Sequence, residues 1–241
     1  VWVLTVSVPV FHTQSGLLWD VMLLHMFNLV LLVGCGYAFY KVTTTDPGSM
    51  DVENCAQIKY WKGLYEETLQ SYANDDHNTD HGASRMSVAA KEIRNRPLCH
   101  TCHIVRPPRS KHDRFTRKCV VMFDHHCPFV ANTVGLYNYK WFYLFLLTMT
   151  LGMLGFWTGL ILYVRRSPTT PWSVLLWGVY LGVHILMSGG MLVYHTQLMM
   201  VNLTTNEHVN VGRYDYFWET LQSSNHENNN NNNNSNTTPR R

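Results

Sequence analysis

The chain is 241 residues long, 15% of its residues are charged, and its formal net charge is +3. The charged fraction is well below the roughly 25% that is typical of soluble domains. Aromatic residues are abundant, at 13%. This composition excludes a collagen, a coiled coil and a small disulfide-stapled secreted domain. The small net charge gives no reason to expect a nucleic-acid partner.

Four apolar stretches follow one another along the chain, and three are long enough to cross a bilayer, which takes roughly 20 apolar residues. The first, Val1 to Phe11, has about half that length and is interpreted as the end of a helix whose start is missing; a signal-peptide core is the alternative. The others run from Leu17 to Tyr40, from Trp141 to Val164 and from Trp172 to about Val201. They are apolar on all sides, as helices in lipid are. The sequence predicts an α-helical polytopic membrane protein with about four transmembrane helices, the first truncated.

A long polar segment, Val42 to Lys140, separates the second and third predicted helices. Together with Lys41 it holds 14 of the 19 Lys and Arg residues. Positive charge near membrane ends is retained in the cytosol, so this segment and the C-terminus are expected there, although Arg165 and Arg166 in a short connection weaken the rule. Within the segment, Val52 to Tyr72 is interpreted as a short amphipathic stretch.

Histidines interrupt the predicted membrane helices at positions 25, 184 and 195. Ionisable groups inside a membrane raise a functional hypothesis, here a proton or ion path through His25, His184 and His195. The favoured interpretation is that each histidine faces the helix bundle and bonds to a neighbour. The spans that begin at Trp141 and Trp172 contain no Asp, Glu, Lys or Arg deep inside them, which argues against a path.

Four of the six cysteines lie between Cys99 and Cys127, in the predicted cytosolic segment. Cytosolic thiols stay reduced, so a metal site or catalysis is favoured over disulfides. Cys99 and Cys102 form a Cys-x-x-Cys knuckle, and His112 and Cys119 follow at spacings that let a second segment complete the set. Three thiolates and one imidazole are the composition of a structural, tetrahedral zinc site. The sequence therefore predicts a zinc ion there.

Cys127 is left over from this set and follows Asp124, His125 and His126. A thiol becomes a good nucleophile at neutral pH when a neighbouring histidine acts as base and an acidic group orients that histidine. Cys127 lies fourteen residues before Trp141, where a membrane helix is predicted to begin. This places it at the cytosolic mouth of the bundle, which suits a substrate with a polar head and a long apolar tail. A fifth metal thiolate is the alternative, and spacing alone leaves both open.

The segment from Cys99 to Asn138 resembles the cysteine-rich domain of the DHHC protein S-acyltransferases (palmitoyltransferases). Two further motifs of that family match outside it, DPG at Asp46 to Gly48 and TTxE at Thr204 to Glu207. The run from Thr204 to Tyr214 is similar to the ankyrin-repeat branch, whose repeats would lie in a missing N-terminal part.

The expected organisation follows from these motifs and spans. It comprises helices 1 (partial) and 2 (residues 1–41), a cytosolic linker with the DPG motif (42–98), the DHHC zinc domain (99–140), helices 3 and 4 (141–201), a C-terminal segment with the TTxE motif (202–224) and a disordered Asn-rich tail (225–241).

The resemblance implies a two-step transfer of a long-chain fatty acyl group. Cys127 would take the acyl group from palmitoyl-CoA or a similar acyl-CoA as a thioester, and a cysteine thiol of a membrane-associated protein would then receive it. The family assigns the base to His125, its orienting partner to Asp124, and the support of Asp124 to Thr205. It makes the second histidine, His126, a zinc ligand and not the base.

The same resemblance implies where the substrates would lie. The acyl chain would lie among the helices within the lipid bilayer, and the CoA phosphates would meet basic side chains at the cytosolic face. Residues 91–119 contain nine Lys and Arg against two acids, which fits that demand. The expected location is an endomembrane, the Golgi or the ER, with the plasma membrane as the alternative.

The sequence departs from the family at its second zinc site. Family members usually hold two zinc ions, and three thiolates of the second set are replaced here: the set falls on Asp113, Thr116, His126 and Thr133. Threonine is a poor zinc ligand, so we expect one zinc ion, with His126 and Asp113 as a remnant of the second site. An Asp113 to His126 hydrogen bond and packing of Phe129, which stands where the family usually has Trp, are expected to hold the loop around Cys127.

Two other functions compete with the acyltransferase. A catalytically weak DHHC-like adaptor that binds client proteins is favoured by the loss of the second zinc set and disfavoured by the intact Asp124, His125 and Cys127. A transporter or channel that uses the intramembrane histidines leaves the cysteine knuckle and the DHHC tetrad unexplained.

Overall fold

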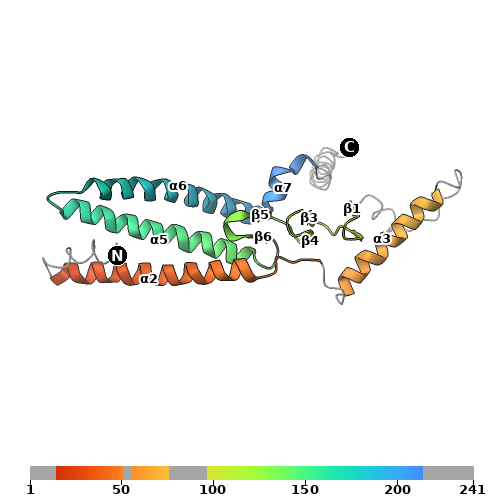
Figure 1. Cartoon of the computed structure of the whole chain (residues 1–241), viewed down its shortest axis with the longest axis horizontal. Coiled ribbons are helices and arrows are strands. Elements are labelled where there is room, and N and C mark those ends of the chain that lie inside the picture. The colour runs from red at the N-terminus through yellow and green to blue at the C-terminus, as the bar shows by residue number, and fades with distance from the viewer. Residues whose placement is uncertain (1–14, 51–55, 76–96, 214–241) are drawn as a thin grey trace, which may run out of the picture.

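The computed structural model describes residues 15–50, 56–75 and 97–213. Three long helices lie side by side and form one elongated part of the molecule (Figure 1): α2 (Ser15–Thr44), α5 (Tyr139–Arg166) and α6 (Trp172–Met200). Each contains a segment long and apolar enough to cross a membrane, with mean hydropathies of 1.8, 1.8 and 1.6. The three complete spans predicted from the sequence are therefore confirmed, and the chain is an integral membrane protein. The partial helix predicted at Val1 to Phe11 lies outside the described residues.

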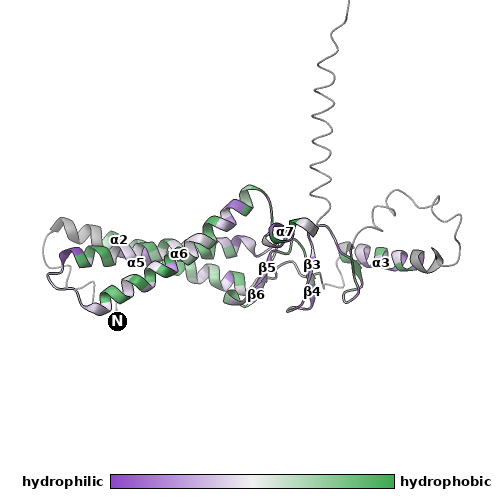
Figure 2. Ribbon diagram, turned by 90° about the horizontal axis from the view of Figure 1, so that it is seen from above, coloured by the Kyte–Doolittle hydropathy of each residue, from purple (hydrophilic) through white to green (hydrophobic). Residues whose placement is uncertain are grey.

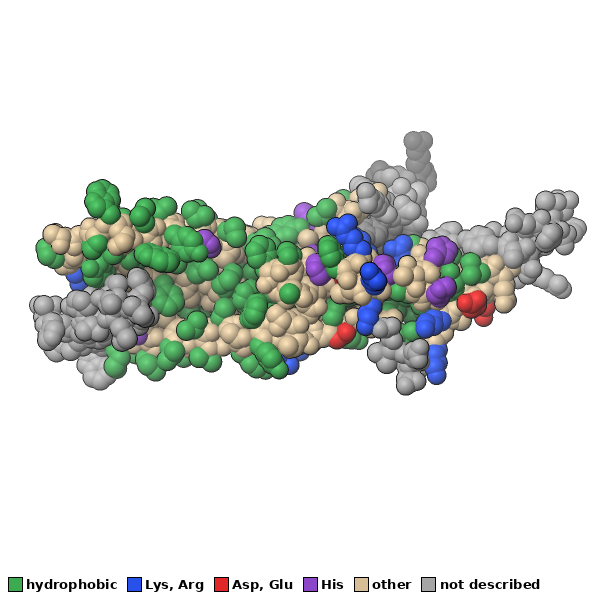
Figure 3. Space-filling view, in the orientation of Figure 1, with side chains coloured by type: hydrophobic (Ala, Val, Ile, Leu, Met, Phe, Trp, Pro, Cys, Tyr) green, Lys and Arg blue, Asp and Glu red, His purple; other side chains and the backbone are tan. Residues whose placement is uncertain are grey.

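The outward faces of these helices are apolar. Large side chains such as Val33, Leu176 and Leu186 are mostly exposed, and apolar residues recur along the bundle in Figures 2 and 3. Such surfaces suit lipid, because the hydrocarbon of a bilayer solvates them. Helices α2 and α5 approach closely where Asn28 meets Gly155. A Cβ atom at Gly155 would collide with the Asn28 side-chain amide, so any larger residue would have to displace that side chain.

Among the described residues between α2 and α5, the chain forms three short antiparallel hairpins, each with two strands. Strand β1 (Leu98–Cys99) pairs with β2 (Ile104–Val105), β3 (Lys111–Asp113) with β4 (Lys118–Val120), and β5 (His125–Cys127) with β6 (Asn132–Val134). They extend from one end of the helix bundle (Figure 1), and basic and histidine side chains gather over them (Figure 3). The 3-10 turn η3 (Pro128–Val130) joins β5 to β6.

Helix α3 (Ala56–Asp75) overlaps the stretch predicted to be amphipathic and contacts β2. Its buried residues include Ile58 and Tyr65, while Tyr60 on another face is exposed. Ile58 belongs to a small core with Ile104 and Cys119. The helix therefore covers the hairpins that carry the cysteine knuckle.

The β5–β6 hairpin is attached to the end of α2 by side-chain hydrogen bonds. The Asn132 Nδ2 atom donates to the main-chain carbonyls of Val42 and Thr43, in the last turn of α2, and of Thr45, just after it. Carbonyls at a helix end lack helical partners, and Asn132 supplies a donor to them. Gly135 follows the hairpin and passes close to the DPG segment, where a Cβ atom would lie 2.5 Å from the Pro47 carbonyl oxygen. These contacts fix β5 at the mouth of the bundle.

The chain after α6 turns back onto the hairpins. Helix α7 (Thr205–Val209) begins with a capping box, in which the Thr204 side chain accepts from the Glu207 N–H and the Glu207 carboxylate accepts from the Thr204 N–H. The 3-10 turn η4 (Val211–Arg213) follows. The TTxE motif therefore forms the N-terminal turn of α7. The Asn-rich tail predicted at residues 225–241 lies outside the described residues.

Candidate active site and metal centre

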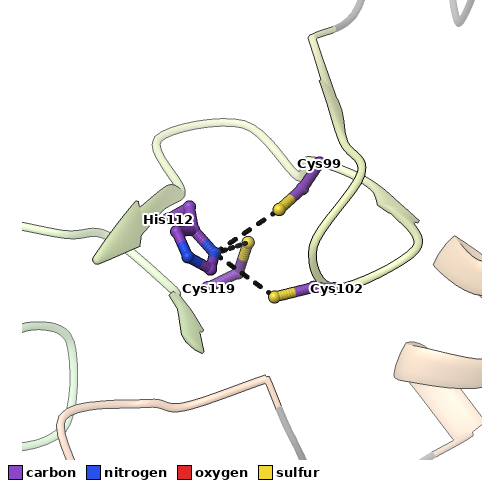
Figure 4. A group of neighbouring side chains, drawn as sticks. All are labelled: Cys99, Cys102, His112 and Cys119. Carbon is purple, nitrogen blue, oxygen red and sulfur yellow. Dashed lines mark hydrogen bonds between the residues drawn. The ribbon is translucent and has the colours of Figure 1, made fainter. Parts of the chain in front are cut away.

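The four residues predicted to bind zinc meet at one point (Figure 4). Cys99 ends β1, Cys102 lies in the turn that follows, and His112 and Cys119 are paired opposite each other on β3 and β4. Their ligand atoms all lie within 4.8 Å of one another. The knuckle and the β3–β4 hairpin are thus the two segments that complete the set.

The spacing of these atoms fits a tetrahedral zinc ion. The His112 Nδ1 atom lies 3.4, 3.3 and 3.8 Å from the sulfur atoms of Cys99, Cys102 and Cys119. Bond lengths of about 2.3 Å to sulfur and 2.0 to 2.1 Å to nitrogen, at tetrahedral angles, require a nitrogen-to-sulfur distance of about 3.6 Å. The observed distances lie on both sides of that value, so this set could hold a metal ion.

The chemistry of the cluster also favours a cation. Burial raises the pKa of the Cys119 thiol far above its ordinary value, and the neighbouring sulfurs of Cys99 and Cys102 add to the effect. The Cys119 thiol is therefore costly to ionise by itself. A divalent cation would remove this cost, because a coordinated thiol is deprotonated and its charge is neutralised.

A second group, at the mouth of the bundle, links Asp124, His125 and Cys127. The His125 Nδ1 atom donates to the Asp124 Oδ2 atom at 2.6 Å. His125 and Cys127 are two residues apart on β5, so their side chains lie on the same face of the strand, and they interact electrostatically. Asp124 is only 1% exposed and Cys127 is buried. A carboxylate, an imidazole and a thiol in series are the arrangement of a nucleophile, its base and the group that orients the base.

The surroundings of these groups favour a charged pair of thiolate and imidazolium. Burial alone would raise the pKa of Cys127, but its hydrogen bonds with His125 and with the main-chain N–H groups of Val130 and Phe129 lower the pKa below its ordinary value. Burial would lower the pKa of His125, but the hydrogen bonds with Asp124 and Cys127 raise it to about 9. The thiolate form of Cys127 is therefore stabilised.

Thr205 of the TTxE motif completes the surroundings of Asp124. Its main-chain N–H donates to Asp124 Oδ1 at 2.7 Å, and its hydroxyl donates to Asp124 Oδ2 at 2.8 Å. Burial would raise the pKa of Asp124, but the hydrogen bonds from His125 and Thr205 outweigh it and lower the pKa. The carboxylate thus stays ionised although it is buried.

The remnant of the second zinc set forms a hydrogen-bonded network. The Asp113 carboxylate accepts from the hydroxyls of Thr116 and Thr133 and from the main-chain N–H groups of Phe115 and Thr116. The Thr133 hydroxyl in turn accepts from His126 Nδ1 at 3.0 Å. His126 is thus joined to Asp113 through the Thr133 hydroxyl. The His126 Nδ1 atom lies 3.7 Å from the Asp113 Oδ2 atom, so two hydrogen bonds through Thr133 replace the expected direct one.

The expectation that Phe129 packs against the loop is wrong. Phe129 is 80% exposed, because it lies on the outer side of η3. Phe115 takes the packing role instead, since its ring stacks on the His126 imidazole at 4.1 Å between centroids. The loop around Cys127 is thus held by the network and by Phe115.

An ion pair that the sequence did not single out joins the hairpins to α7. The Arg109 guanidinium donates to both oxygens of the Glu207 carboxylate, at 2.7 and 2.8 Å, and to the Asn202 carbonyl. Glu207 is 1% exposed. Lys111 also donates to the Asn206 side chain. No local sequence pattern predicts an ion pair between two residues that are 98 positions apart.

A cleft of about 550 Å³ opens beside the Asp124–His125 pair. Lys111 and Arg114 contribute to its wall, together with the stacked rings of Phe115 and His126. The cleft therefore offers positive charge and flat aromatic surface next to the candidate base. Among the histidines of the membrane helices, His195 is buried and bonds to Tyr139, as the favoured interpretation expected, whereas His184 bonds to the main chain of its own helix.

Comparison with known proteins decides the family. Residues 92–212 match the DHHC palmitoyltransferase family, and this range includes the metal centre, the DHHC tetrad and the TTxE motif. The chain belongs to this family. Human palmitoyltransferase ZDHHC9 is 37% identical over 129 residues, which cover 46% of this chain and 33% of the relative.

Two further DHHC relatives come from a yeast and a plant. Palmitoyltransferase SWF1 of Yarrowia lipolytica is 65% identical over 49 residues, 20% of this chain and 13% of that protein. Probable protein S-acyltransferase 7 of Arabidopsis thaliana is 34% identical over 128 residues, 48% of this chain and 29% of that protein. The matches thus span about a third or less of these relatives. The ankyrin-repeat branch stays a prediction.

Proposed function

We propose that this DHHC chain carries the catalytic site of a protein S-acyltransferase, which moves a long-chain fatty acyl group from acyl-CoA to cysteine thiols of membrane-associated proteins. The observation that carries the proposal is that His125 is hydrogen-bonded to Asp124 and lies on the same face of β5 as Cys127. It lies at the membrane end of the hairpins, where an apolar chain and a polar head can be held together. The names of the DHHC relatives support the same reaction.

The reaction is proposed to proceed in two balanced steps. The Cys127 thiolate attacks the carbonyl carbon of acyl-CoA, the bond from that carbon to the CoA sulfur breaks, and His125 gives its proton to the leaving thiolate. In the second step the acceptor thiol gives its proton to His125 and attacks the acyl-Cys127 thioester, which releases the Cys127 thiolate. Asp124 keeps the imidazole oriented and stabilises its charged form.

The surroundings support this choice of substrates. Lys111 and Arg114 in the cleft can face the phosphates of CoA, because clustered positive charge attracts polyanions. The acyl chain extends from Cys127 between the membrane helices. In this proposal the hairpins face the cytosol, and the membrane is an endomembrane. One zinc ion binds to Cys99, Cys102, His112 and Cys119 and fixes the knuckle against β3 and β4.

The test is acyl loading of the purified chain with a labelled palmitoyl-CoA. The parent chain is expected to take up a label that hydroxylamine removes, and Cys127→Ser is expected to lose it, because a hydroxyl ionises far less readily than a thiol. Cys35→Ser is the matched control, since Cys35 is another unpaired thiol but lies on α2. Label that persists in Cys127→Ser would overturn the assignment.

The adaptor alternative makes a different prediction. It is favoured by one observation, the replacement of the second zinc set by hydrogen bonds among Asp113, Thr116, Thr133 and His126. Under this alternative the folded parent chain, with its zinc bound, takes no label from acyl-CoA.

A further inference from the structure

His195 lies on the membrane helix α6 but belongs to the surroundings of the candidate base. Its side chain is 1% exposed. Its ring centroid lies 5.7 Å from that of His125, 4.9 Å from that of Phe142 and 5.9 Å from that of Tyr139. Phe142 also contacts His125 edge to face, at 5.1 Å. His125, Phe142 and His195 therefore form one packed cluster, to which β5, α5 and α6 each contribute one ring.

The polar atoms of His195 are only half satisfied. Its Nδ1 atom is 3.1 Å from the Tyr139 hydroxyl. Its Nε2 atom is buried and has no hydrogen-bond partner among the described residues. Buried polar atoms without a hydrogen-bond partner are uncommon, because burying them unpaired costs free energy. When the Tyr139 hydroxyl donates to Nδ1, Nε2 carries the hydrogen and is a donor without an acceptor.

The catalytic pair lies close to the ring of His195. One ring nitrogen of His195, one of His125 and a carboxylate oxygen of Asp124 all lie within 4.8 Å of one another. Two polar atoms at such a distance can share one water molecule. A metal ion is a poorer explanation, because His125 Nδ1 and Asp124 Oδ2 already bond to each other and Thr205 donates to both oxygens of Asp124.

We propose that His195, oriented by Tyr139, is a positioning residue for the base. It holds the His125 ring against Cys127 from the membrane side, by ring contact and by an Nε2 donor that supports the charge of Asp124. Its role rests on the proposed function, in which His125 loses its proton to the leaving thiol. While His125 is neutral, Asp124 loses a cationic neighbour, and a further donor then keeps the buried carboxylate ionised and in place.

The test is the rate at which iodoacetamide alkylates Cys127, measured peptide by peptide in the purified, zinc-loaded full chain. This reaction needs the Cys127 thiolate and its neighbour His125 but no acyl-CoA. His195→Leu is expected to slow it about tenfold, the effect of a lost hydrogen bond to a charged network. His195→Gln places an amide donor near the former Nε2 position, and is expected to recover most of the rate. Tyr139→Phe, which removes one oxygen, is expected to slow alkylation about threefold.

Two matched controls come from the same helices. Tyr143→Phe removes a tyrosine hydroxyl that bonds to Thr196 between α5 and α6. His184→Leu removes a histidine of α6 that bonds to the main-chain carbonyl of Tyr180. Both are expected to alkylate at the parent rate. Zinc content and melting temperature report the fold of each variant; if His195→Leu does not fold, Tyr139→Phe alone decides.

The outcomes separate this proposal from the acyltransferase itself. A parent rate in His195→Leu, or a His195→Gln variant as slow as His195→Leu, would show that His195 only fills space and would overturn the proposal. Acyl loading at saturating acyl-CoA is expected to fall by the same factor as alkylation, with an unchanged half-saturating concentration. If the variants show the expected alkylation rates but the parent chain takes no acyl label, the proposed function is contradicted and the role of His195 in activating Cys127 is kept.

Discussion

Replacing Thr133 with Val tests whether hydrogen bonds have taken over the role of a second zinc ion. The substitution keeps the shape of the side chain and removes one hydroxyl, which is fully buried. That hydroxyl donates to the Asp113 carboxylate and accepts from His126. His126 lies between His125 and Cys127 on β5, so the lost hydrogen bond is directly next to the candidate nucleophile in the chain.

The size of the effect follows from these two bonds. A hydrogen bond to a charged group contributes about 1.5 to 3 kcal/mol, and one between neutral groups about 1 kcal/mol. Asp113 would keep its bonds from Thr116 and Phe115, so Thr133→Val is expected to lose about 2 to 4 kcal/mol of the free energy of unfolding. The melting temperature should fall by roughly 5 to 15 °C.

The assay combines thermal unfolding in detergent with zinc analysis. Thr133→Ser keeps the hydroxyl and is expected to melt near the parent chain. The parent, Thr133→Val and Thr133→Ser should each hold about one equivalent of zinc, whereas replacing both Cys99 and Cys102 with Ala should bring zinc near zero. Two equivalents in the parent chain, or a Thr133→Val variant as stable as the parent, would refute this explanation.

Three further substitutions test the site. His125 has a pKa raised from 6.5 to about 9, so it keeps its proton at neutral pH. Its contribution to the stability of the fold is full below pH 6.5 and is lost as the pH rises through about 9. His125→Ala should therefore cut acyl loading about a hundredfold near neutral pH, with partial recovery at about pH 9 as the Cys127 thiol ionises unaided; unchanged loading at neutral pH would make His125 structural. Arg109→Met leaves the buried Glu207 carboxylate without its guanidinium and should cost about 3 kcal/mol of unfolding free energy, read as a lower melting temperature; Arg109→Lys should recover part of it. Thr205→Val removes the hydroxyl donor but keeps the N–H, so loading should fall roughly tenfold while zinc content stays constant, and equal loading would show that the N–H suffices.

The membrane helices and the metal set could be predicted because each has a local signal. Lipid exposure makes every face of α5 apolar, so the span is visible in composition alone. The knuckle at Cys99 and Cys102 has a spacing set by the metal itself. The structure brings these predicted ligands together, and it also brings Asp124, His125 and Cys127 into one series.

The rest depended on contacts between distant residues. The strands have two or three residues each, too few for an alternating pattern. The Arg109–Glu207 pair and the position of His195 beside His125 depend on how the end of α6 returns to the hairpins. The prediction for Phe129 was wrong because an apolar side chain does not show in the sequence that it lies on the exposed side of η3.

The hydrogen bonds from Thr205 and Asn206 to Asp124 join residues that the ribosome makes some 80 positions apart. A nascent chain that has reached only α5 already contains the zinc ligands, the base and the nucleophile, but the Thr205 and Asn206 donors to Asp124 have not been synthesised. They reach it only after α6 has entered the bilayer and its far end has come back to the hairpins. Reactivity of Cys127 is thereby linked to completed membrane insertion, and a chain whose last helix fails to insert carries a poorly activated thiol.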